Sequence, residues 1–332
     1  GVIDEVQRAP DLLLAIKSVV DKDNTPGRYL ITGSNQPHVG RAVGDSLIGR
    51  AAYRTLRPLT LSEMRFEELH AGWSFLISSS TSDALLELER RAARSGPLEW
   101  KDIVATGGYP RAVATDPAHR TRMLEDYVTA FVQRDVRAVL GIEDVNRFEN
   151  FFRLLAARTG QELNANGLGG ELGVQAKTIQ RWIDALTRSY MIDGVPVYSR
   201  NSGQRVIKAS KVFFVDAALA IAAARETNAS GFHLENLVVS DVGVWRDAAP
   251  GRAWYHWRLR SGQEVDLVLE ENNALLPVEV KTTPSINWSD ARHLRTFIDR
   301  HANAQRGVLL SNDPEIRELG PDVIAAPWWA VL

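Results

Sequence analysis

The sequence predicts an α/β protein built from several domains, and three observations lead to this fold class. The chain has 332 residues, of which 45% are hydrophobic and 24% charged, values typical of a globular protein with two or three packed domains. Strand-like apolar runs alternate with a helical pattern at its start, an order typical of a parallel sheet. Toward its end the predicted order is helix, three strands, helix and strand, which indicates a second sheet.

Composition excludes several kinds of functional site. Because the chain has no cysteine, disulfides, thiolate metal sites and thiol nucleophiles are excluded, and any metal must bind through oxygen or imidazole. The formal net charge is −2, so nucleic-acid binding would depend on a local basic patch. No apolar run has the length of a membrane span, so we expect a cytoplasmic protein without a membrane partner. Gly1 stands in place of Met and Val2 already belongs to a strand, so we also expect a preceding segment to be missing.

Residues 1–60 are predicted to form a strand, a helix and a second strand, which would be part of a larger sheet. Asp4 and Glu5 directly follow the first strand. A strand that ends in Asp-Glu is how P-loop ATPases place one carboxylate near Mg²⁺ and the next against the attacking water. Asn35 is a candidate for orienting that water, and Arg50 for an arginine finger toward a neighbouring subunit. The alternative is that Asp4 and Glu5 are solvated turn residues.

Residues 61–147 are predicted to be a helical connector, and residues 148–215 a winged helix. The connector is mostly helical, with a break at residues 107–110. The next region has three helical segments followed by two β-like runs at residues 194–198 and 211–215, an order typical of winged helices.

The third helix of this region has one basic face. Lys177, Arg181 and Arg188 follow helical spacing along that face, and the opposite face is apolar. Further basic residues lie in the predicted wing, namely Arg200, Arg205, Lys208 and Lys211. A basic recognition helix with a basic wing suits contacts with the phosphates of double-stranded DNA. A solvated helix face or an interdomain surface is the alternative.

Residues 216–332 are predicted to hold two carboxylates and a lysine on neighbouring strands. Glu279 and Lys281 share one face of their strand, and Asp266 joins that face if its own strand pairs with it. This set suits metal-assisted phosphodiester hydrolysis, in which Asp266 and Glu279 hold Mg²⁺ while Lys281 positions water or steadies developing charge. The sequence therefore predicts a nuclease-like site in the last domain.

The Glu-x-Lys triplet is weak by itself, since Glu99 and Lys101 show the same pattern in a helical setting. The order of helix and strands around it is more specific. Asp266 or Glu279 could instead form a structural salt bridge with Lys281 or Arg258, because an unpaired buried carboxylate is costly. An active nuclease and an inactive relic of a nuclease fold are therefore equal alternatives.

Several segments, taken in order and spacing, resemble a widespread prokaryotic AAA ATPase family. Residues 2–7, 30–34 and 46–50 look like its Walker B, sensor and arginine segments. In that family a domain of unknown function with a restriction-endonuclease-like core follows the ATPase, and later segments resemble it, at residues 107–110, 134–135, 211–216 and 235–238. The resemblance implies a partial P-loop ATPase sheet and a PD-(D/E)xK nuclease-like domain, in which Glu235 would be an extra acidic residue.

The phosphate-binding motif G-x-x-x-x-G-K-[ST] does not occur in the sequence, and the family places it upstream of Gly1. ATP would therefore be a cofactor only with that part present, and we expect Asp4 and Glu5 to be idle. The predicted function is that of an AAA-type ATP-binding protein with a nuclease-like domain that acts on DNA with Mg²⁺. The alternative is a non-catalytic DNA-binding or interaction module, with a protein partner or a second copy of the chain.

Overall fold

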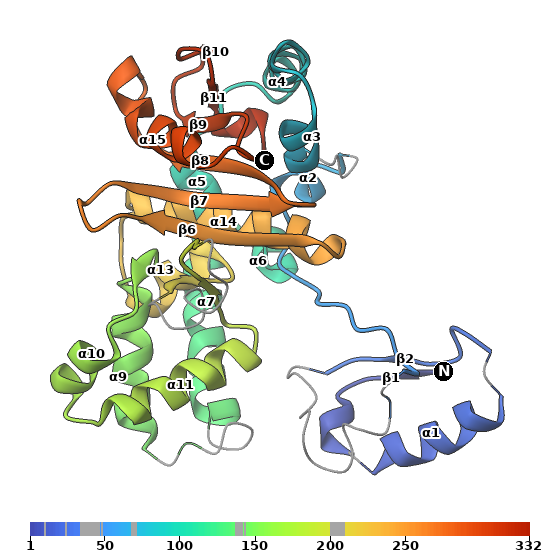
Figure 1. The fold of residues 1–332 in the computed structure, drawn as a ribbon. Helices are drawn as coiled ribbons and strands as arrows, with labels where there is room; N and C mark the ends of the chain where they lie inside the picture. The colour runs from blue at the N-terminus through green and yellow to red at the C-terminus, as the bar shows by residue number, and fades with distance from the viewer. Residues whose placement is uncertain are drawn as a thin grey trace.

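Within the described part of the chain, helices combine with three sheets, which confirms the predicted α/β class. The structure is a computed structural model that describes residues 1–9, 11–23, 25–33, 47, 49–67, 72–136, 142, 144–199 and 210–332. The sheets have two, three and six strands. Figure 1 shows the two-stranded part set apart from the rest and joined to it by an extended stretch. None of the described helices has the length and apolar character needed to cross a membrane.

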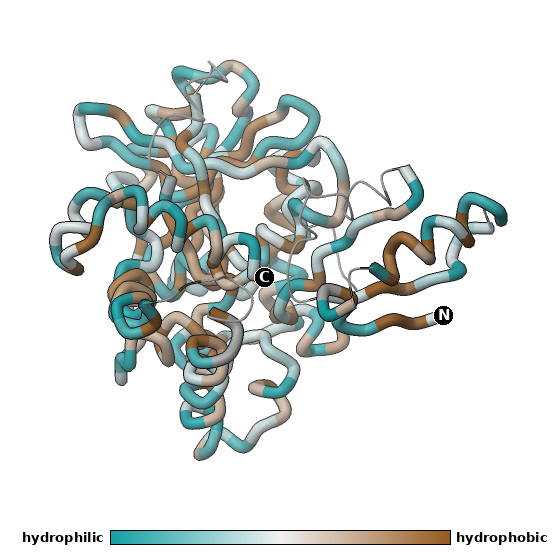
Figure 2. The backbone as a smooth tube through the Cα atoms, turned by 90° about the horizontal axis from the view of Figure 1, so that it is seen from below, coloured by the Kyte–Doolittle hydropathy of each residue, from teal (hydrophilic) through white to brown (hydrophobic). Residues whose placement is uncertain are grey.

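The N-terminal unit is a strand, a helix and a parallel strand. The elements are β1 (Val2–Ile3), α1 (Leu12–Lys22) and β2 (Leu30–Ile31). Val2 pairs with Leu30 and Ile3 with Ile31, so the predicted parallel pairing is confirmed. Both Val2 and Leu30 are exposed, and Figure 2 shows the hydrophobic character of this stretch next to the N-terminus.

A series of helices follows the extended residues 51–60, as predicted for the connector. They are α2 (Leu61–Met64), α3 (Gly72–Ser78), α4 (Thr81–Ser95), α5 (Trp100–Thr106), α6 (Pro110–Ala114) and α7 (Pro117–Ala130). The predicted break is confirmed between α5 and α6. It occurs there because Gly107 ends α5 with a positive φ of 66° and Pro110 begins α6.

Three helices and a three-stranded antiparallel sheet form the next part of the chain. The helices are α9 (Val145–Ala156), α10 (Ala165–Leu172) and α11 (Ala176–Arg188). The strands are β3 (Gln161–Glu162), β4 (Ile192–Val195) and β5 (Lys211–Phe214), with β5 in the middle. Phe148, Phe151, Phe152, Trp182 and Phe214 pack in its core. We refer to this part as the helix–sheet module.

Two helices lead from the module to the large sheet. They are α13 (Ala217–Ala224) and α14 (Gly231–Ala248). The sequence predicts α14 but not α13, whose residues Ala217–Ala224 are apolar throughout and buried except for half-buried Ile221. A helix that is buried on all sides has no amphipathic period for a sequence pattern to show.

The large sheet has the strand order β10-β11-β9-β8-β7-β6. The strands are β6 (Arg252–Arg258), β7 (Glu264–Glu271), β8 (Ala274–Val280), β9 (Gly307–Ser311), β10 (Arg317–Glu318) and β11 (Val323–Pro327). Strands β6, β7 and β8 are antiparallel, whereas β8, β9 and β11 are parallel. Helix α15 (Arg292–Arg300) contributes to the core on one face, and α14 with α3 and α4 to the core on the other.

The extended stretch is held at a junction of three elements by Arg57. Its guanidinium donates to Asp193 on β4 and to Asp247 on α14, both at 2.7 Å, and its side chain is buried. Gly243 on α14 leaves space for this guanidinium, since a Cβ at that position would lie 2.6 Å from Nη1 of Arg57. The path of residues 51–60 is therefore tied to both the helix–sheet module and the large sheet.

The segments at residues 107–110 and 211–216 meet at a buried carboxylate. Asp216 accepts hydrogen bonds from the backbone N–H of Gly108 at 2.6 Å and of Leu219, at the start of α13, at 2.9 Å. The N–H of Leu59 in turn donates to the carbonyl of Gly108 at 2.7 Å. Two stretches far apart in sequence are thus joined because Asp216 satisfies backbone donors of both.

We expect Gly108→Ala to destabilise the protein, because the new Cβ would lie 2.2 Å from the backbone oxygen of Leu59, which cannot rotate away. Overpacking of this kind costs about 2 kcal/mol or more of unfolding free energy. Urea unfolding measures the change. Gly170→Ala is the control, because nothing lies within 4 Å of its Cβ position on α10. An equal loss in both variants would contradict the close approach at Gly108.

Candidate functional site

The structure brings together the four acidic and basic residues predicted for the last domain. Asp266 lies on β7, Glu279 on β8, Lys281 just beyond β8 and Glu235 on α14. The Nζ of Lys281 lies 2.6 Å from Oε1 of Glu279, and Oδ2 of Asp266 accepts the backbone N–H of Val280 at 2.9 Å. The predicted pairing of these two strands, and the shared face of Glu279 and Lys281, are therefore confirmed.

Lys211 and Glu264 complete this group, and the sequence prediction for Lys211 is wrong. Lys211 is 5% exposed instead of lying on a basic wing. Its Nζ lies 2.7 Å from Oε1 of Glu264, 3.0 Å from Oε1 of Glu235 and 3.7 Å from Oδ1 of Asp266. Because β5 is the central strand of its sheet, Lys211 is enclosed instead of solvated. We call these six residues the carboxylate–lysine cluster.

One signal for Lys211 was present in the sequence. It begins the run Lys211–Phe214, which is otherwise apolar and is followed by Val215 and Asp216. A lysine at the edge of a continuous apolar strand needs a carboxylate partner when it is buried. The identity of that partner was not readable, because Glu235, Glu264 and Asp266 come from other elements.

A β-bulge sets the direction of Asp266. On β6, Tyr255 pairs with Val268 and Trp257 with Val265, so two residues of β7 lie opposite the single His256. Bulges of this kind occur next to active sites and re-aim a side chain. Asp266 is one of the two residues in the bulge, which lets its carboxylate reach both the end of β8 and Lys211.

Burial raises the pKa of two of the carboxyl groups. Burial first, and the negative charge of Asp266 second, raise the pKa of Glu279 to about 8, and Lys281 only partly opposes this. The same two causes raise the pKa of Glu235 to about 8 despite its ion pair with Lys211. Perturbed pKa values of this kind are concentrated at functional sites, although structural ion-pair networks show them too.

The two lysines are held in the charged form. Burial alone would lower the pKa of Lys211, but the carboxylates of Glu235, Asp266 and Glu264 outweigh it and raise the pKa. Burial likewise opposes the charged form of Lys281, and Glu279 raises its pKa. Each end of the cluster therefore contains one ammonium group in contact with carboxyl groups of acidic residues.

Glu279 offers the atom best suited to bind a cation. Its Oε2 is buried and has no hydrogen-bond partner among the described residues, while its Oε1 contacts Lys281. Mg²⁺ is often held by one or two carboxylates and several waters. No group of three or more His, Asp or Glu residues in the described ranges is arranged to hold a metal ion. A cation here would thus be held by Asp266 and Glu279 together with water.

The candidate nucleotide residues lie in the separate N-terminal unit. Asp4 accepts a hydrogen bond from the hydroxyl of Thr32 just after β2, and Glu5 has a left-handed backbone with φ 55°. Arg50 forms an ion pair with Asp21 of α1 in the same chain, so a finger role would require this pair to open. Asn35 lies outside the described residues.

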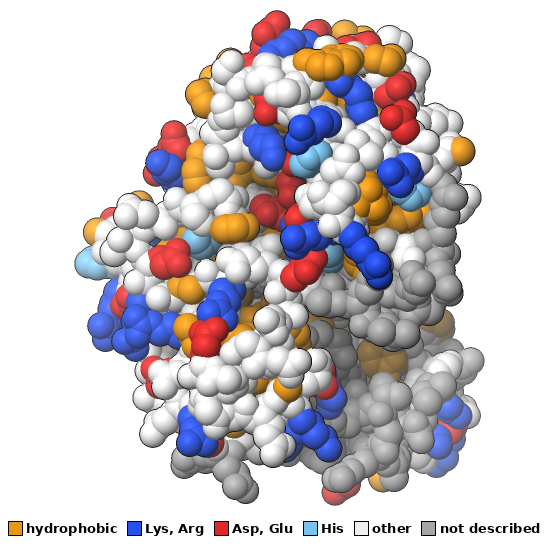
Figure 3. Space-filling view, turned by 60° about the vertical axis from the view of Figure 1, so that its left-hand side comes forward, with side chains coloured by type: hydrophobic (Ala, Val, Ile, Leu, Met, Phe, Trp, Pro, Cys, Tyr) orange, Lys and Arg blue, Asp and Glu red, His pale blue; other side chains and the backbone are white. Residues whose placement is uncertain are grey.

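The basic residues predicted to contact DNA lie on the outer side of α11. Lys177, Arg181 and Arg188 are exposed, and Arg205, Arg200 and Lys208 lie outside the described residues. The apolar residues of the same helix are buried, as predicted, namely Ile179, Trp182, Ile183 and Leu186. On the face of the molecule that Figure 3 displays, Lys and Arg side chains lie among acidic ones instead of forming one continuous basic surface.

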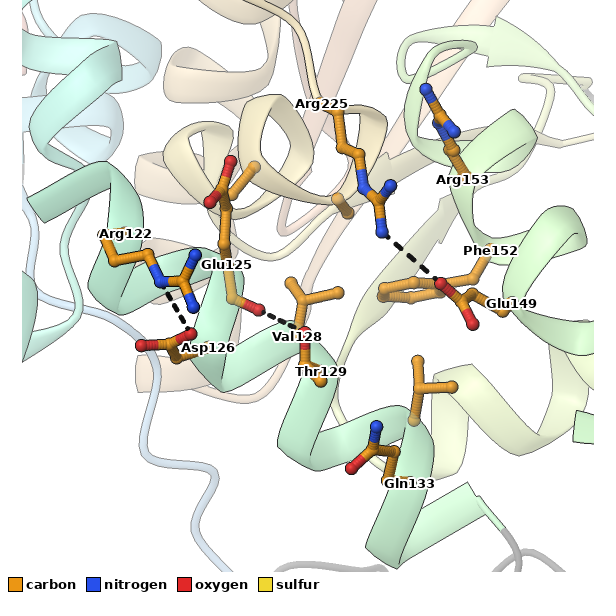
Figure 4. A pocket seen from close by; sticks show the side chains of 13 residues that line it. Arg122, Glu125, Asp126, Val128, Thr129, Gln133, Glu149, Phe152, Arg153 and Arg225 are labelled. Carbon is orange, nitrogen blue, oxygen red and sulfur yellow. Dashed lines mark hydrogen bonds and ion pairs between the residues drawn. The ribbon is translucent and has the colours of Figure 1, made fainter. Parts of the chain in front are cut away.

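A pocket of about 470 Å³ lies between α7, α9 and α13, away from the residues of the cluster. Its charged side chains compensate one another: Arg122 pairs with Asp126 at 3.0 Å and Arg225 with Glu149 at 3.5 Å. Figure 4 shows both pairs along its wall. The pocket therefore has no excess charge that would select an ionic ligand.

The raised pKa of Glu279 predicts a pH-dependent stability. In the folded protein Glu279 keeps its proton up to about pH 8, whereas in the unfolded chain it releases the proton at its ordinary pKa of about 4.5. The contribution of protonated Glu279 to the free energy of unfolding is therefore fully present below about pH 4.5, and it is lost as pH rises through about 8. We expect Glu279→Gln to gain stability over the wild type between pH 5 and 8.5, by roughly a few kcal/mol.

Urea unfolding at several pH values in chelator-treated buffer measures this gain. Glu89→Gln, on the exposed side of α4, controls for removal of a charge alone. A difference between Glu279→Gln and the wild type that stays constant from pH 5 to 8.5 would show that Glu279 is not protonated on folding.

Three protein-family descriptions match consecutive parts of the chain. Residues 1–65 match an AAA domain, residues 98–230 a domain of unknown function (DUF8612), and residues 230–331 another domain of unknown function (DUF4143). A solved structure, that of protein VC1899 from Vibrio cholerae, is 18% identical, covers 62% of this chain and 51% of that one, and has a TM-score of 0.22. A TM-score this low does not establish a shared fold.

Two curated proteins are similar to most of the chain. They are the uncharacterized protein Mb2031c of Mycobacterium bovis and the uncharacterized protein Rv2008c of Mycobacterium tuberculosis. Each is 28% identical over 310 residues, which cover 86% of this chain and 60% of the relative. The chain thus spans about 60% of the length of these relatives. Residues 1–65 are thus similar to an AAA domain and residues 230–331 to DUF4143, and each match covers less than half of the chain.

Proposed function

We propose that the protein is an AAA-type ATPase-like protein whose large-sheet domain cleaves phosphodiester bonds with Mg²⁺ and acts on double-stranded DNA. The observation that supports this most is the convergence of Asp266, Glu279 and Lys281 at the ends of two neighbouring strands, with one buried carboxylate oxygen of Glu279 left without a hydrogen bond. A PD-(D/E)xK nuclease-like fold is the proposed origin of this arrangement.

The residues of the cluster would have different roles in this reaction. Asp266 and Glu279 would hold Mg²⁺, which supplies Lewis-acid stabilisation of the phosphate and a nucleophilic water. Lys281 is 39% exposed at its side chain, so its ammonium can both contact Glu279 and orient a water or a phosphate oxygen. Glu235 is buried on α14. The charge of its carboxyl group, which depends on whether it is protonated, would act on Asp266.

The helix–sheet module is the proposed DNA-binding part, as a winged helix. Its third helix, α11, buries one face in the module and presents Lys177, Arg181 and Arg188 on the other. Phosphate contacts by such residues position a protein on the duplex without reading its sequence.

The N-terminal unit is proposed to hold part of a nucleotide site, with Asp4 and Glu5 in the Walker B positions. The sequence contains no G-x-x-x-x-G-K-[ST] motif, so we propose that this polypeptide does not bind ATP by itself. Titration calorimetry with ATP tests this, and stoichiometric binding at micromolar concentrations would contradict it.

A second candidate function is a non-catalytic DNA-binding or interaction module with a relic nuclease fold. The ion pairs favour it, because Lys281 contacts Glu279 while Lys211 contacts Glu235, Glu264 and Asp266. Such a network satisfies its buried charges without a metal or a substrate. Metal binding distinguishes the two candidates.

We expect Asp266→Asn and Glu279→Gln to lose Mn²⁺ binding in calorimetry, since they remove the carboxylate ligands. Lys281→Met should keep Mn²⁺ binding but lose cleavage of linear duplex DNA by about 100-fold or more, as is typical for loss of a group that stabilises charge.

Lys101→Met is the matched control, because Lys101 has the same Glu-x-Lys pattern on α5 and lies outside the cluster. Metal-dependent cleavage that survives in Lys281→Met would contradict the role of Lys281. Absence of both metal binding and cleavage in the wild type would favour the relic.

Binding to DNA should depend on salt through α11. Replacing Lys177, Arg181 and Arg188 by Gln should weaken duplex binding in fluorescence anisotropy and reduce the slope of log K against log salt by about 2 to 3. A triple variant of the exposed residues Arg90, Arg94 and Lys101, on α4 and α5, is the control. Equal slopes in wild type and α11 variant would place DNA contacts elsewhere.

A further inference from the structure

Lys211 belongs to a different part of the chain from its partners. It is the first residue of β5 in the helix–sheet module, whereas Glu235 lies on α14 and Glu264 and Asp266 lie on β7. Its side chain is only 6% exposed, so it is not available to a phosphate in solvent. Its role is therefore to be sought inside the cluster.

Oxygen atoms of three carboxylates surround the ammonium of Lys211, at 2.7, 3.0 and 3.7 Å. Carboxylate oxygens are the ligands that a hard divalent cation prefers, but with the ammonium in place these three carboxyl groups of the described chain are not arranged to hold a metal ion. The place between them is occupied by a cation that the chain itself supplies. Lysine suits this position better than arginine would, because its ammonium is a compact point charge with rotatable donors.

We propose that Lys211 is the resident cation of this half of the cluster, so that the site admits a single divalent ion, on the side of Asp266 and Glu279. This rests on the proposed function in one respect only, namely that Asp266 and Glu279 are the ligands. Asp266 faces both halves, since Oδ1 lies toward Lys211 and Oδ2 accepts the N–H of Val280 on β8.

The consequence is a one-ion arrangement. Two-ion phosphodiesterase sites hold their metals about 4 Å apart on shared carboxylates. A second ion that shared Asp266 on the other side would have to take the place of the ammonium between Glu235 and Glu264. Lys211 thus positions Asp266 and excludes that ion by charge repulsion.

Mn²⁺ binding to the full chain tests the proposal, with the number of sites read by electron paramagnetic resonance. We expect Lys211→Met to bind one more Mn²⁺ than the wild type, because the vacated position keeps its three carboxylates. Lys211→Arg, which keeps the positive charge, and Lys101→Met, exposed on α5 and outside the cluster, should bind the same number as the wild type. An unchanged number of sites in Lys211→Met would overturn the proposal.

Two further measurements cover a variant that does not fold. If Lys211→Met unfolds in metal-free buffer, refolding on addition of Mn²⁺ supports the resident-cation role, and no refolding counts against it. In an otherwise wild-type chain, Glu264→Gln should leave the Mn²⁺ affinity within about twofold, because Glu264 faces the ammonium. Weakening by about tenfold or more would show that Glu264 serves the metal.

The two proposals fail in different ways. If the wild type binds no Mn²⁺ while Lys211→Met binds one, the metal-dependent nuclease is contradicted and the role of Lys211 is supported. If the wild type binds one Mn²⁺ through Asp266 and Glu279, and Lys211→Met also binds only one, the nuclease site is supported and the role of Lys211 is contradicted.

Discussion

The ammonium group of Lys211 is the point on which the arrangement of the C-terminal part depends. It contacts Glu235 of α14 and Glu264 and Asp266 of β7, while its backbone belongs to the central strand of the helix–sheet module. A buried charge must be paired, and removing one partner of a buried pair costs roughly 3–5 kcal/mol. The module is therefore tied to the large sheet by an interaction that tolerates little displacement. A direct backbone connection adds to it, since Tyr198 donates to the carbonyl of His256 at 2.6 Å on the edge strand β6.

The same requirement, that buried polar groups be satisfied, explains two other junctions. Arg57 is paired with Asp193 and Asp247, and Asp216 accepts backbone N–H groups from Gly108 and Leu219. In both places glycines allow the approach, because a Cβ on Gly108 or Gly243 would overlap the extended stretch. The stretch that leads from the N-terminal unit is consequently held against the elements that carry the carboxylate–lysine cluster.

The cluster combines features of a structural network and of a reactive site. Its lysines neutralise part of the acidic charge, as a structural network requires, and burial raises the pKa of Glu235 and Glu279. A purely structural network, however, has no need for a buried carboxylate oxygen without a hydrogen bond, and Oε2 of Glu279 is such an atom. The β-bulge at Asp266 is a second feature of this kind, because it interrupts the pairing of β6 and β7 at the residue that faces both lysine-bearing halves. These two features favour the proposed metal-dependent site over the relic of a nuclease fold.

The sequence by itself determined the α/β class, most helices and strands, and the meeting of Asp266, Glu279 and Lys281. These predictions succeeded because they depend on local periodicity, and because β7 and β8 are consecutive strands joined by a short turn. The sequence did not reveal α13 or β11, because both are buried on nearly all sides and show no alternation of apolar and polar residues. Only the tertiary structure decided the role of Lys211. From the sequence it was grouped with the other basic residues on a solvated wing. The charge of a side chain is a local property, but its burial and its partners depend on which distant elements pack around it.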